Sequence, residues 1–195
     1  MDYIMELLIE VIPFVMTVGA IYIVLRAVSL KRRGSGRDSW PRECVRLAFV
    51  CYMAGLLALV WAPNGMWGGL WLLLRYGWPM ECWGMMFRGE YSFDISFLGL
   101  VSGQWVRTML LGNVLMFVPL GLLLPLRWPG LSLPKVLAAG ACIDLTIEVV
   151  QPVFGRSFDM EDLFCNTLGI LLGLGIYIVL RRIFPRFIRM CQGKS

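Results

Sequence analysis

The sequence contains no histidine among its 195 residues. Imidazole is the usual base that activates a serine and the commonest metal ligand, so catalysis or metal binding that needs it is excluded. Charge is also scarce, because Asp, Glu, Lys and Arg make up 16% of the chain whereas hydrophobic residues make up 58%. A soluble domain carries about 25% charged residues. We therefore predict an integral protein of the cell membrane.

The cysteines lack the spacing of a zinc site, since no CxxC pair occurs. There are six of them: Cys44, Cys51, Cys82, Cys142, Cys165 and Cys191. Most lie in or beside apolar runs, where a free thiol behaves as a small hydrophobic side chain. We interpret them as packing residues.

Apolar runs dominate the chain, and a helix that crosses a bilayer needs roughly 20 apolar residues. We place five spans at about 5–30, 47–62, 107–126, 136–153 and 163–183. The first has an acidic flank and no small-residue cleavage site, so we expect a retained helix and not a signal peptide. The fold class that we predict is all-α, a multi-pass transmembrane bundle of about five helices.

The chain divides into four parts on this basis. Residues 1–46 hold the first helix and a basic loop, and residues 47–106 hold the second helix and a segment rich in tryptophan. Tryptophan is enriched at membrane interfaces, but the sequence does not resolve the path of residues 63–106. Residues 107–185 form a core of three helices, and residues 186–195 form a basic tail.

Basic residues predict the orientation of the bundle. Fourteen of the 18 lysines and arginines lie on alternate loops: seven between 26 and 46, two between 127 and 135, and five in the tail. The other four are Arg75, Arg88, Arg107 and Arg156. Because cytoplasmic loops carry the excess of Lys and Arg, we place the N-terminus outside and the C-terminus in the cytoplasm. The basic loop thus needs no nucleic-acid partner.

On this topology, polar side chains gather toward the outer ends of the last three spans. Polar groups in apolar spans are expensive and are functional candidates by default. The candidate set comprises Asn113, Glu148, Gln151, Arg156, Asp159, Asp162 and Asn166. Asp144 shares the helical face of Glu148, but we place it near mid-bilayer and outside this outward-facing polar pocket.

The fifth span carries a small-residue motif. Asn166, Gly169 and Gly173 are spaced i, i+3 and i+7, so they share one face of the helix. A GxxxG spacing lets two membrane helices approach closely. We expect this face to pack against the fourth span with Asn166 pointing inward.

Two interpretations of the polar residues are non-catalytic. In the first, Arg156 pairs with Asp159 or Asp162, and Asp162 caps the fifth helix. In the second, the residues bind a polar ligand. Carboxylates of Glu148, Asp159 and Asp162 with the amide of Asn166 suit Mg²⁺ or Ca²⁺. Arginines suit an anionic headgroup, and the candidates are Arg88, Arg107 and Arg156.

Two further interpretations are an enzyme and a transporter. Glu148 as a buried acid and Asp159 as an exposed base could act on a lipid-linked envelope precursor, but no activated nucleophile is evident. Asp144 could relay protons in a small oligomeric transporter. We favour a binding role over catalysis, with no cofactor other than a divalent cation at the carboxylates. The expected partners are the bilayer and an envelope lipid or lipoglycopeptide, and the oligomeric state is open.

Three motifs in the last three spans carry a family resemblance. They are N-x-x-x-F-x-P-L-G at Asn113–Gly121, I-E-x-x-Q at Ile147–Gln151, and R-x-x-D-x-x-D-x-x-x-N-x-x-G at Arg156–Gly169. Their order and spacing resemble the VanZ-like family over about residues 107–175. The characteristic positions that the resemblance implies are Asn113, Pro119, Glu148, Gln151, Arg156, Asp159, Asp162 and Asn166.

The resemblance implies a bacterial multi-pass membrane protein without an assigned reaction. The family's founding member is linked to resistance to the glycopeptide teicoplanin, so resistance is the expected phenotype. Position 144 is more usually a small hydroxyl residue in the family, and here it is Asp144. The resemblance therefore gives Asp144 no role in a shared site.

Overall fold

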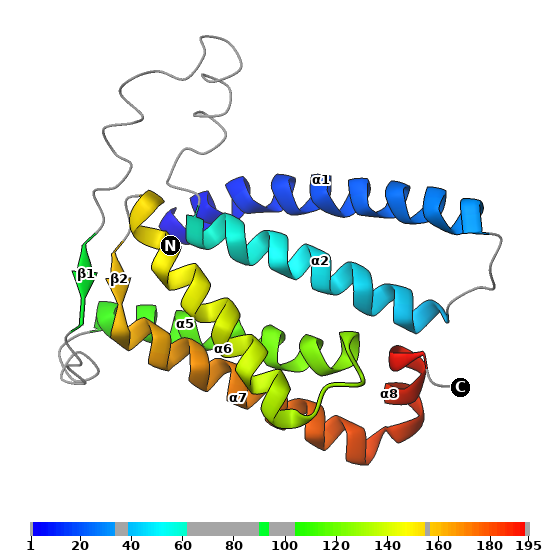
Figure 1. Cartoon of the computed structure of the whole chain (residues 1–195). Helices are drawn as coiled ribbons and strands as arrows, with labels where there is room; N and C mark the ends of the chain where they lie inside the picture. The colour runs from blue at the N-terminus through cyan, green and yellow to red at the C-terminus, as the bar shows by residue number, and fades with distance from the viewer. Residues whose placement is uncertain (1, 34–38, 62–89, 94–103, 155–156, 194–195) are drawn as a thin grey trace, which may run out of the picture.

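The computed structural model describes residues 2–33, 39–61, 90–93, 104–154 and 157–193. Its helices are α1 (Asp2–Arg33), α2 (Trp40–Trp61), α5 (Gln104–Arg127), α6 (Leu133–Val150), α7 (Met160–Ile183) and α8 (Pro185–Gln192). A 3₁₀ turn η2 (Gln151–Phe154) follows α6, and the short strands are β1 (Tyr91–Ser92) and β2 (Phe158–Asp159). Figure 1 shows α1, α2, α5 and α7 running lengthwise in roughly one direction, with α6 crossing diagonally among them.

Five of these helices are long and apolar enough to cross a membrane. The spanning stretches are Val11–Arg32, Trp40–Val60, Leu110–Arg127, Leu133–Val153 and Met160–Ile183. The prediction of an all-α bundle of five spans is confirmed. The chain is a multi-pass membrane protein.

The basic segment between the first two spans is more helical than predicted. α1 continues to Arg33, and α2 already begins at Trp40. Pro41 does not break this helix, because a proline in the first turn lacks only an amide that would have no helical partner. Arg26 of α1 donates to Glu43 of α2 through Nε at 3.0 Å and Nη2 at 2.8 Å. This bidentate ion pair joins the two helices near their connection.

The closest helix pair in the bundle is α5 with α7. A Cβ added to Gly169 would lie 2.2 Å from the carbonyl oxygen of Val114, and one added to Gly173 would lie 2.0 Å from that of Val118. Gly121 of α5 is equally close to the carbonyl of Ile170. Such contacts are tolerated only without a side chain. The prediction that this face packs against the fourth span holds for Asn166, which bonds to α6, but not for the two glycines, whose backbone contacts are with α5.

α6 and α2 complete the core around this pair. A Cβ on Gly140 of α6 would lie 3.0 Å from the side chain of Ile170. Phe117 and Leu120 of α5 are fully buried. The Tyr52 hydroxyl of α2 donates to the carbonyl of Met116 at 2.9 Å, one turn before Pro119. α5 remains helical through that proline, as neighbouring helices allow in a membrane.

The predicted basic tail forms a docked helix. α8 buries Ile188 and Cys191 against the bundle. Gln192 donates to the hydroxyl of Tyr177 at 2.9 Å, and Ser39 donates to the carbonyl of Met190 at 2.8 Å. α8 therefore lies at the end of the bundle where α1 meets α2 and α5 meets α6 (Figure 1).

A small sheet lies at the opposite end. β1 pairs in parallel with β2, with Tyr91 opposite Phe158 and Ser92 opposite Asp159. The Phe158 ring also lies 5.5 Å from that of Phe93. The sequence did not resolve the path of residues 63–106. Strand β1, which is part of that segment, lies beside the start of α7. Residues 62–89 and 94–103 of that segment are outside the described residues.

Candidate functional site

Three polar side chains of the α6 region point into the protein. Asp144 and Glu148 are one helical turn apart on α6, and Gln151 begins η2, where Pro152 cannot continue the α-helical hydrogen bonds. Asp144 is 0% exposed, Glu148 1% and Gln151 4%. Their i, i+4 and i+7 spacing places them on one face, as the sequence predicted.

Asn166 of α7 ties these residues together. Its side-chain nitrogen Nδ2 donates to Oδ1 of Asp144 at 2.8 Å and to Oε1 of Glu148 at 3.2 Å. The Gln151 amide donates to the same Glu148 oxygen at 3.3 Å. The hydroxyl of Thr167 lies 3.5 Å from Oδ2 of Asp144. We call Asp144, Glu148, Gln151 and Asn166 the buried cluster.

The buried cluster is costly for the fold and chemically distinctive. Isolated carboxylates are strongly disfavoured away from water, so the hydrogen bonds from Asn166 offset part of that cost. The nitrogen of the Asn166 amide is fully hydrogen-bonded, but its oxygen is not. Oδ1 is buried and has no hydrogen-bond partner in the described part of the chain. Buried polar atoms rarely stay unpaired, so this oxygen is a position where a ligand atom or water would gain a hydrogen bond.

Asn113 and Asp162 form a second polar contact. The Asn113 amide of α5 donates to the Asp162 carboxylate of α7, in the first turn of that helix. The prediction that Asp162 caps α7 is wrong. Asp159 has the extended backbone of an N-cap, and its side chain accepts from the backbone amide of Glu161 at 2.9 Å.

The predicted carboxylate trio is therefore distributed over three contacts. Glu148 belongs to the buried cluster, Asp159 caps α7, and Asp162 pairs with Asn113. Among the described residues, no three acidic or cysteine side chains gather as they would around a metal ion. A divalent cation at these carboxylates stays a hypothesis.

The three arginines that we expected to bind an anionic headgroup have side chains outside the described residues. Arg88 and Arg156 lie outside the described residues. Arg107 lies in the first turns of α5, and its side chain is likewise outside them. Their predicted roles remain predictions.

Asp144 is the member of the buried cluster that the sequence-based prediction placed outside the polar pocket. Depth in the bilayer and the resemblance both argued against including it. Its carboxylate nevertheless makes the shortest hydrogen bond between members of the buried cluster. The signal was present in its i, i+4 spacing to Glu148. What was missing was the position of Asn166, which reaches both turns of α6.

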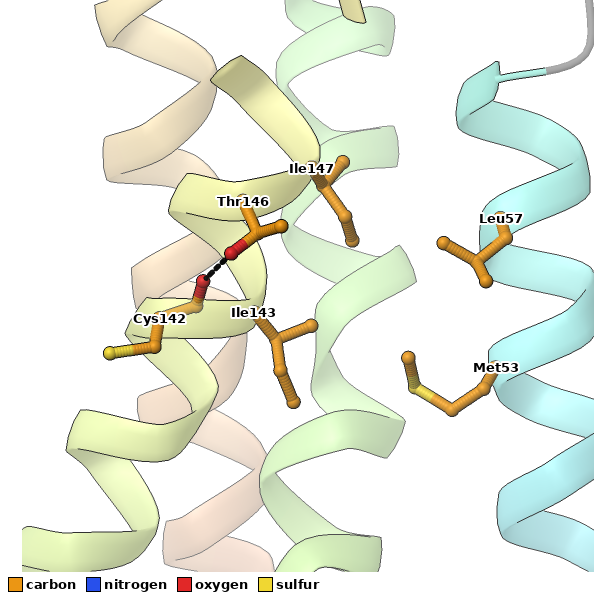
Figure 2. A pocket seen from close by; sticks show the side chains of 6 residues that line it. All are labelled: Met53, Leu57, Cys142, Ile143, Thr146 and Ile147. Atoms are coloured by element: carbon orange, nitrogen blue, oxygen red, sulfur yellow. Dashed lines mark hydrogen bonds between the residues drawn. The ribbon is translucent and has the colours of Figure 1, made fainter. Parts of the chain in front are cut away.

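A shallow apolar groove of about 270 Å³ lies between α2 and α6. Figure 2 shows Met53 and Leu57 of α2 facing Ile143 and Ile147 of α6. Thr146 also lines it, but its hydroxyl donates to the carbonyl of Cys142 at 2.7 Å, as the dashed line in Figure 2 marks. None of the groove's lining residues belongs to the buried cluster, so this groove is distinct from the polar pocket expected from the sequence.

Comparison with known proteins now places these residues in a family. The family described as VanZ/LLP1 matches residues 49–181, well over half of the chain. The chain belongs to the VanZ-like family. The matched region of this VanZ-like protein contains the whole buried cluster and the glycines of the α5–α7 contact, whereas α1 and α8 lie outside it.

One curated relative supports the same assignment. A stretch of 69 residues is 33% identical to Protein VanZ of Enterococcus faecium. It covers 35% of this VanZ-like chain and 43% of that protein, so the match spans less than half of the relative. No solved structure matches the chain.

Proposed function

We propose that this VanZ-like protein binds a polar group of an envelope component or lipoglycopeptide at the outer leaflet and thereby protects the cell against teicoplanin. The proposal is supported by membership of the VanZ-like family and by the partial similarity to Protein VanZ. The binding site is a polar pocket that contains the buried cluster and opens away from the cytoplasm.

The observation that carries the proposal is the bridge from Asn166 to Asp144 and Glu148. Buried ionic groups are weak contributors to stability, because apolar residues of similar size usually serve a core as well or better. Two carboxylates joined by one amide inside a membrane bundle therefore favour a binding role over a purely structural one.

The distribution of basic residues supports the outward orientation that we propose. Lys and Arg side chains accompany the ends of α1, α5 and α7 that lie near α8. Cytoplasmic loops carry such an excess. The opposite end, where α6 finishes and α7 begins, then faces outward, and Gln151 and Asp162 lie there.

Teicoplanin susceptibility tests the proposal directly. The full chain is expressed in a susceptible bacterium, and the minimum inhibitory concentration is compared with that of cells carrying Glu148→Gln or Asp159→Asn. Both substitutions remove a charge at nearly constant shape, and asparagine caps a helix about as well as aspartate. We expect both variants to insert at wild-type levels and to lose protection.

The matched control is Thr146→Val, on the face of α6 turned away from the buried cluster, where the side chain is exposed and lines the apolar groove. It should protect as well as the wild type. Full protection by both Glu148→Gln and Asp159→Asn would contradict the site assignment.

A membrane enzyme that acts on a lipid-linked precursor is the second candidate. It is favoured by one observation, that Glu148 accepts from both Asn166 and Gln151 whereas Asp144 accepts from Asn166 and Thr167, so the two acids have different surroundings. Altered envelope lipid or peptidoglycan composition on expression would favour the enzyme. Unchanged composition together with direct ligand binding would favour the binding protein.

A further inference from the structure

The short helix α8 runs across the end of the bundle and does not continue the direction of the spans. Phe184 separates it from the end of α7 at Ile183. Ser39, directly before α2, donates to the carbonyl of Met190 near the other end of α8 at 2.8 Å. Figure 1 shows α8 reaching from the end of α7 toward the start of α2. Because α7 and α2 both span the membrane, a helix that runs between their ends lies along the membrane face.

The exposed part of α8 has an apolar side and a basic side. The side of α8 toward the bundle is buried. Phe187 is 54% exposed and Met190 is 47% exposed, and their i, i+3 spacing places them together. Arg186 and Arg189 are also exposed and have the same spacing, so they lie together on a neighbouring side. Phenylalanine on one side and arginine on another is the pattern of a helix that lies in a membrane interface.

The last turn of α7 extends the basic side of α8. Arg181 and Arg182 are exposed there, directly before α8. We call these residues and the exposed side chains of α8 the interfacial patch: Arg181, Arg182, Arg186, Arg189, Phe187 and Met190. In the described part of the chain, none of its four arginines takes part in an ion pair. The acidic side chain described at this end of the bundle, Glu43, bonds to Arg26 and Arg46 instead.

The interfacial patch fits an anionic phospholipid better than a soluble acidic partner. Arginines near a membrane surface are attracted to anionic headgroups, and their N–H groups bind phosphate oxygens. The apolar side favours a bilayer, because Phe187 and Met190 lie beside the ends of the spans and would leave water on entering the boundary of the acyl chains. A basic segment that served only to orient the spans would need no such apolar side.

We propose that the interfacial patch binds the headgroups of anionic phospholipids in the leaflet that it meets. Its arginines contact the phosphate groups, and Phe187 and Met190 enter the boundary between headgroups and acyl chains. The patch shares no residue with the buried cluster, so the proposal does not depend on the ligand proposed for that cluster.

Thermal unfolding of the purified full chain in a neutral detergent tests this lipid site. Short-chain phosphatidylglycerol supplies an anionic headgroup, and phosphatidylcholine of the same chain length supplies a zwitterionic one. A ligand that binds only the folded state raises the Tm in a saturable way. We expect phosphatidylglycerol to raise the Tm by several degrees more than phosphatidylcholine does, and added salt should reduce the difference by screening. Equal shifts with the two lipids would overturn the proposal.

Variants assign the effect to the interfacial patch. Arg186→Gln combined with Arg189→Gln should abolish most of the difference between the two lipids. The matched control is Lys31→Gln combined with Arg32→Gln, which removes the same charge from exposed residues of α1 at the same end of the bundle. The control should retain most of the difference. An equal loss in both double variants would show a general effect of positive charge and would overturn the assignment to α8.

The apolar side of the patch has a separate readout. Phe187→Ser changes no charge, yet it should lower the affinity for phosphatidylglycerol several-fold in the same titration, because less apolar surface leaves water. Inorganic phosphate and a polyglutamate peptide supply negative charge without acyl chains. A Tm shift with either that matches the shift with phosphatidylglycerol, or wild-type affinity in Phe187→Ser, would contradict a membrane lipid as the occupant.

Discussion

The amide nitrogen of Asn166 lies 2.8 Å from the carboxylate of Asp144, although 22 residues separate them in the chain. This contact joins α7 to the middle of α6 through two buried polar groups. The same nitrogen reaches Glu148 one helical turn away. One amide therefore sets the relative position of two helices and of both carboxylates.

A double-mutant cycle between Asp144 and Asn166 should reveal strong coupling. Each single alanine variant leaves a buried partner without its hydrogen bond, which costs about 1–3 kcal/mol, whereas the double variant removes both groups. We expect a coupling energy of about 1 kcal/mol or more from denaturation in mixed micelles. Asp144 with Asn113, whose amide donates to Asp162 instead, is the control pair and should be additive. Additivity for Asp144 and Asn166 would contradict the contact.

Gly173→Ala should destabilise the bundle, and Gly175→Ala should not. The added methyl at Gly173 would lie 2.0 Å from the Val118 carbonyl, which forces α5 and α7 apart, and such overpacking costs about 1–3 kcal/mol. Gly175 is on the same helix with nothing within 4 Å of the added atom, so alanine gains about 0.5–1 kcal/mol of helix propensity there. Thermal unfolding of the two variants measures the difference. A Gly173→Ala protein as stable as Gly175→Ala would refute the close approach.

The proposed orientation predicts the sidedness of two labels in a cysteine-free background. A cysteine placed at the exposed Ser157, between α6 and α7, should react with a membrane-impermeant maleimide in intact cells. A cysteine restored at the exposed position Cys44, in the basic region of α2, should react only after the membrane is opened. The reverse pattern would place the buried cluster toward the cytoplasm.

Cys191 of α8 should make folding stability depend on alkaline pH. Burial, and secondarily the nearby Cys44 thiol, raises the pKa of the Cys191 thiol above its ordinary value of 9.0. A group whose pKa is raised on folding contributes stability that is complete below its unfolded pKa and is lost as the pH rises through its folded pKa.

The pH dependence is measured against a variant that cannot titrate at this position. The Tm of the wild type should fall more steeply than that of Cys191→Ala above about pH 9. Cys142→Ala, on an exposed cysteine, should follow the wild type. Parallel curves for all three proteins would show that Cys191 does not titrate differently on folding.

The sequence predicted the spans well because an apolar run of sufficient length has few alternatives to a membrane helix. It was less reliable at helix ends. A basic loop was expected up to residue 46, but α2 begins at Trp40, because proline is favoured in a first turn and Glu43 pairs with Arg26 across the connection. Similarly, residue type suggested Asp162 as a cap, but the extended backbone and the side-chain contact of Asp159 make that residue the N-cap of α7.

Spacing predicts which residues share a helical face, but it does not say which helix that face meets. The GxxxG of α7 was assigned to the fourth span and lies against the third, because Val114 and Val118 of α5 present their backbone there. Asp144 was set aside because of its depth and the resemblance, and spacing could not correct this, since its partner Asn166 comes from another helix.

Composition and periodicity alone determined that this chain enters a membrane and where its apolar spans lie. They also determined which polar side chains share a helical face, because these properties follow from local sequence. Tertiary structure decided that α7 packs on α5 through glycine, that Asn166 joins Asp144 to Glu148, and that the basic tail docks as α8. Those choices depend on contacts between segments distant in the chain, and no single segment encodes them.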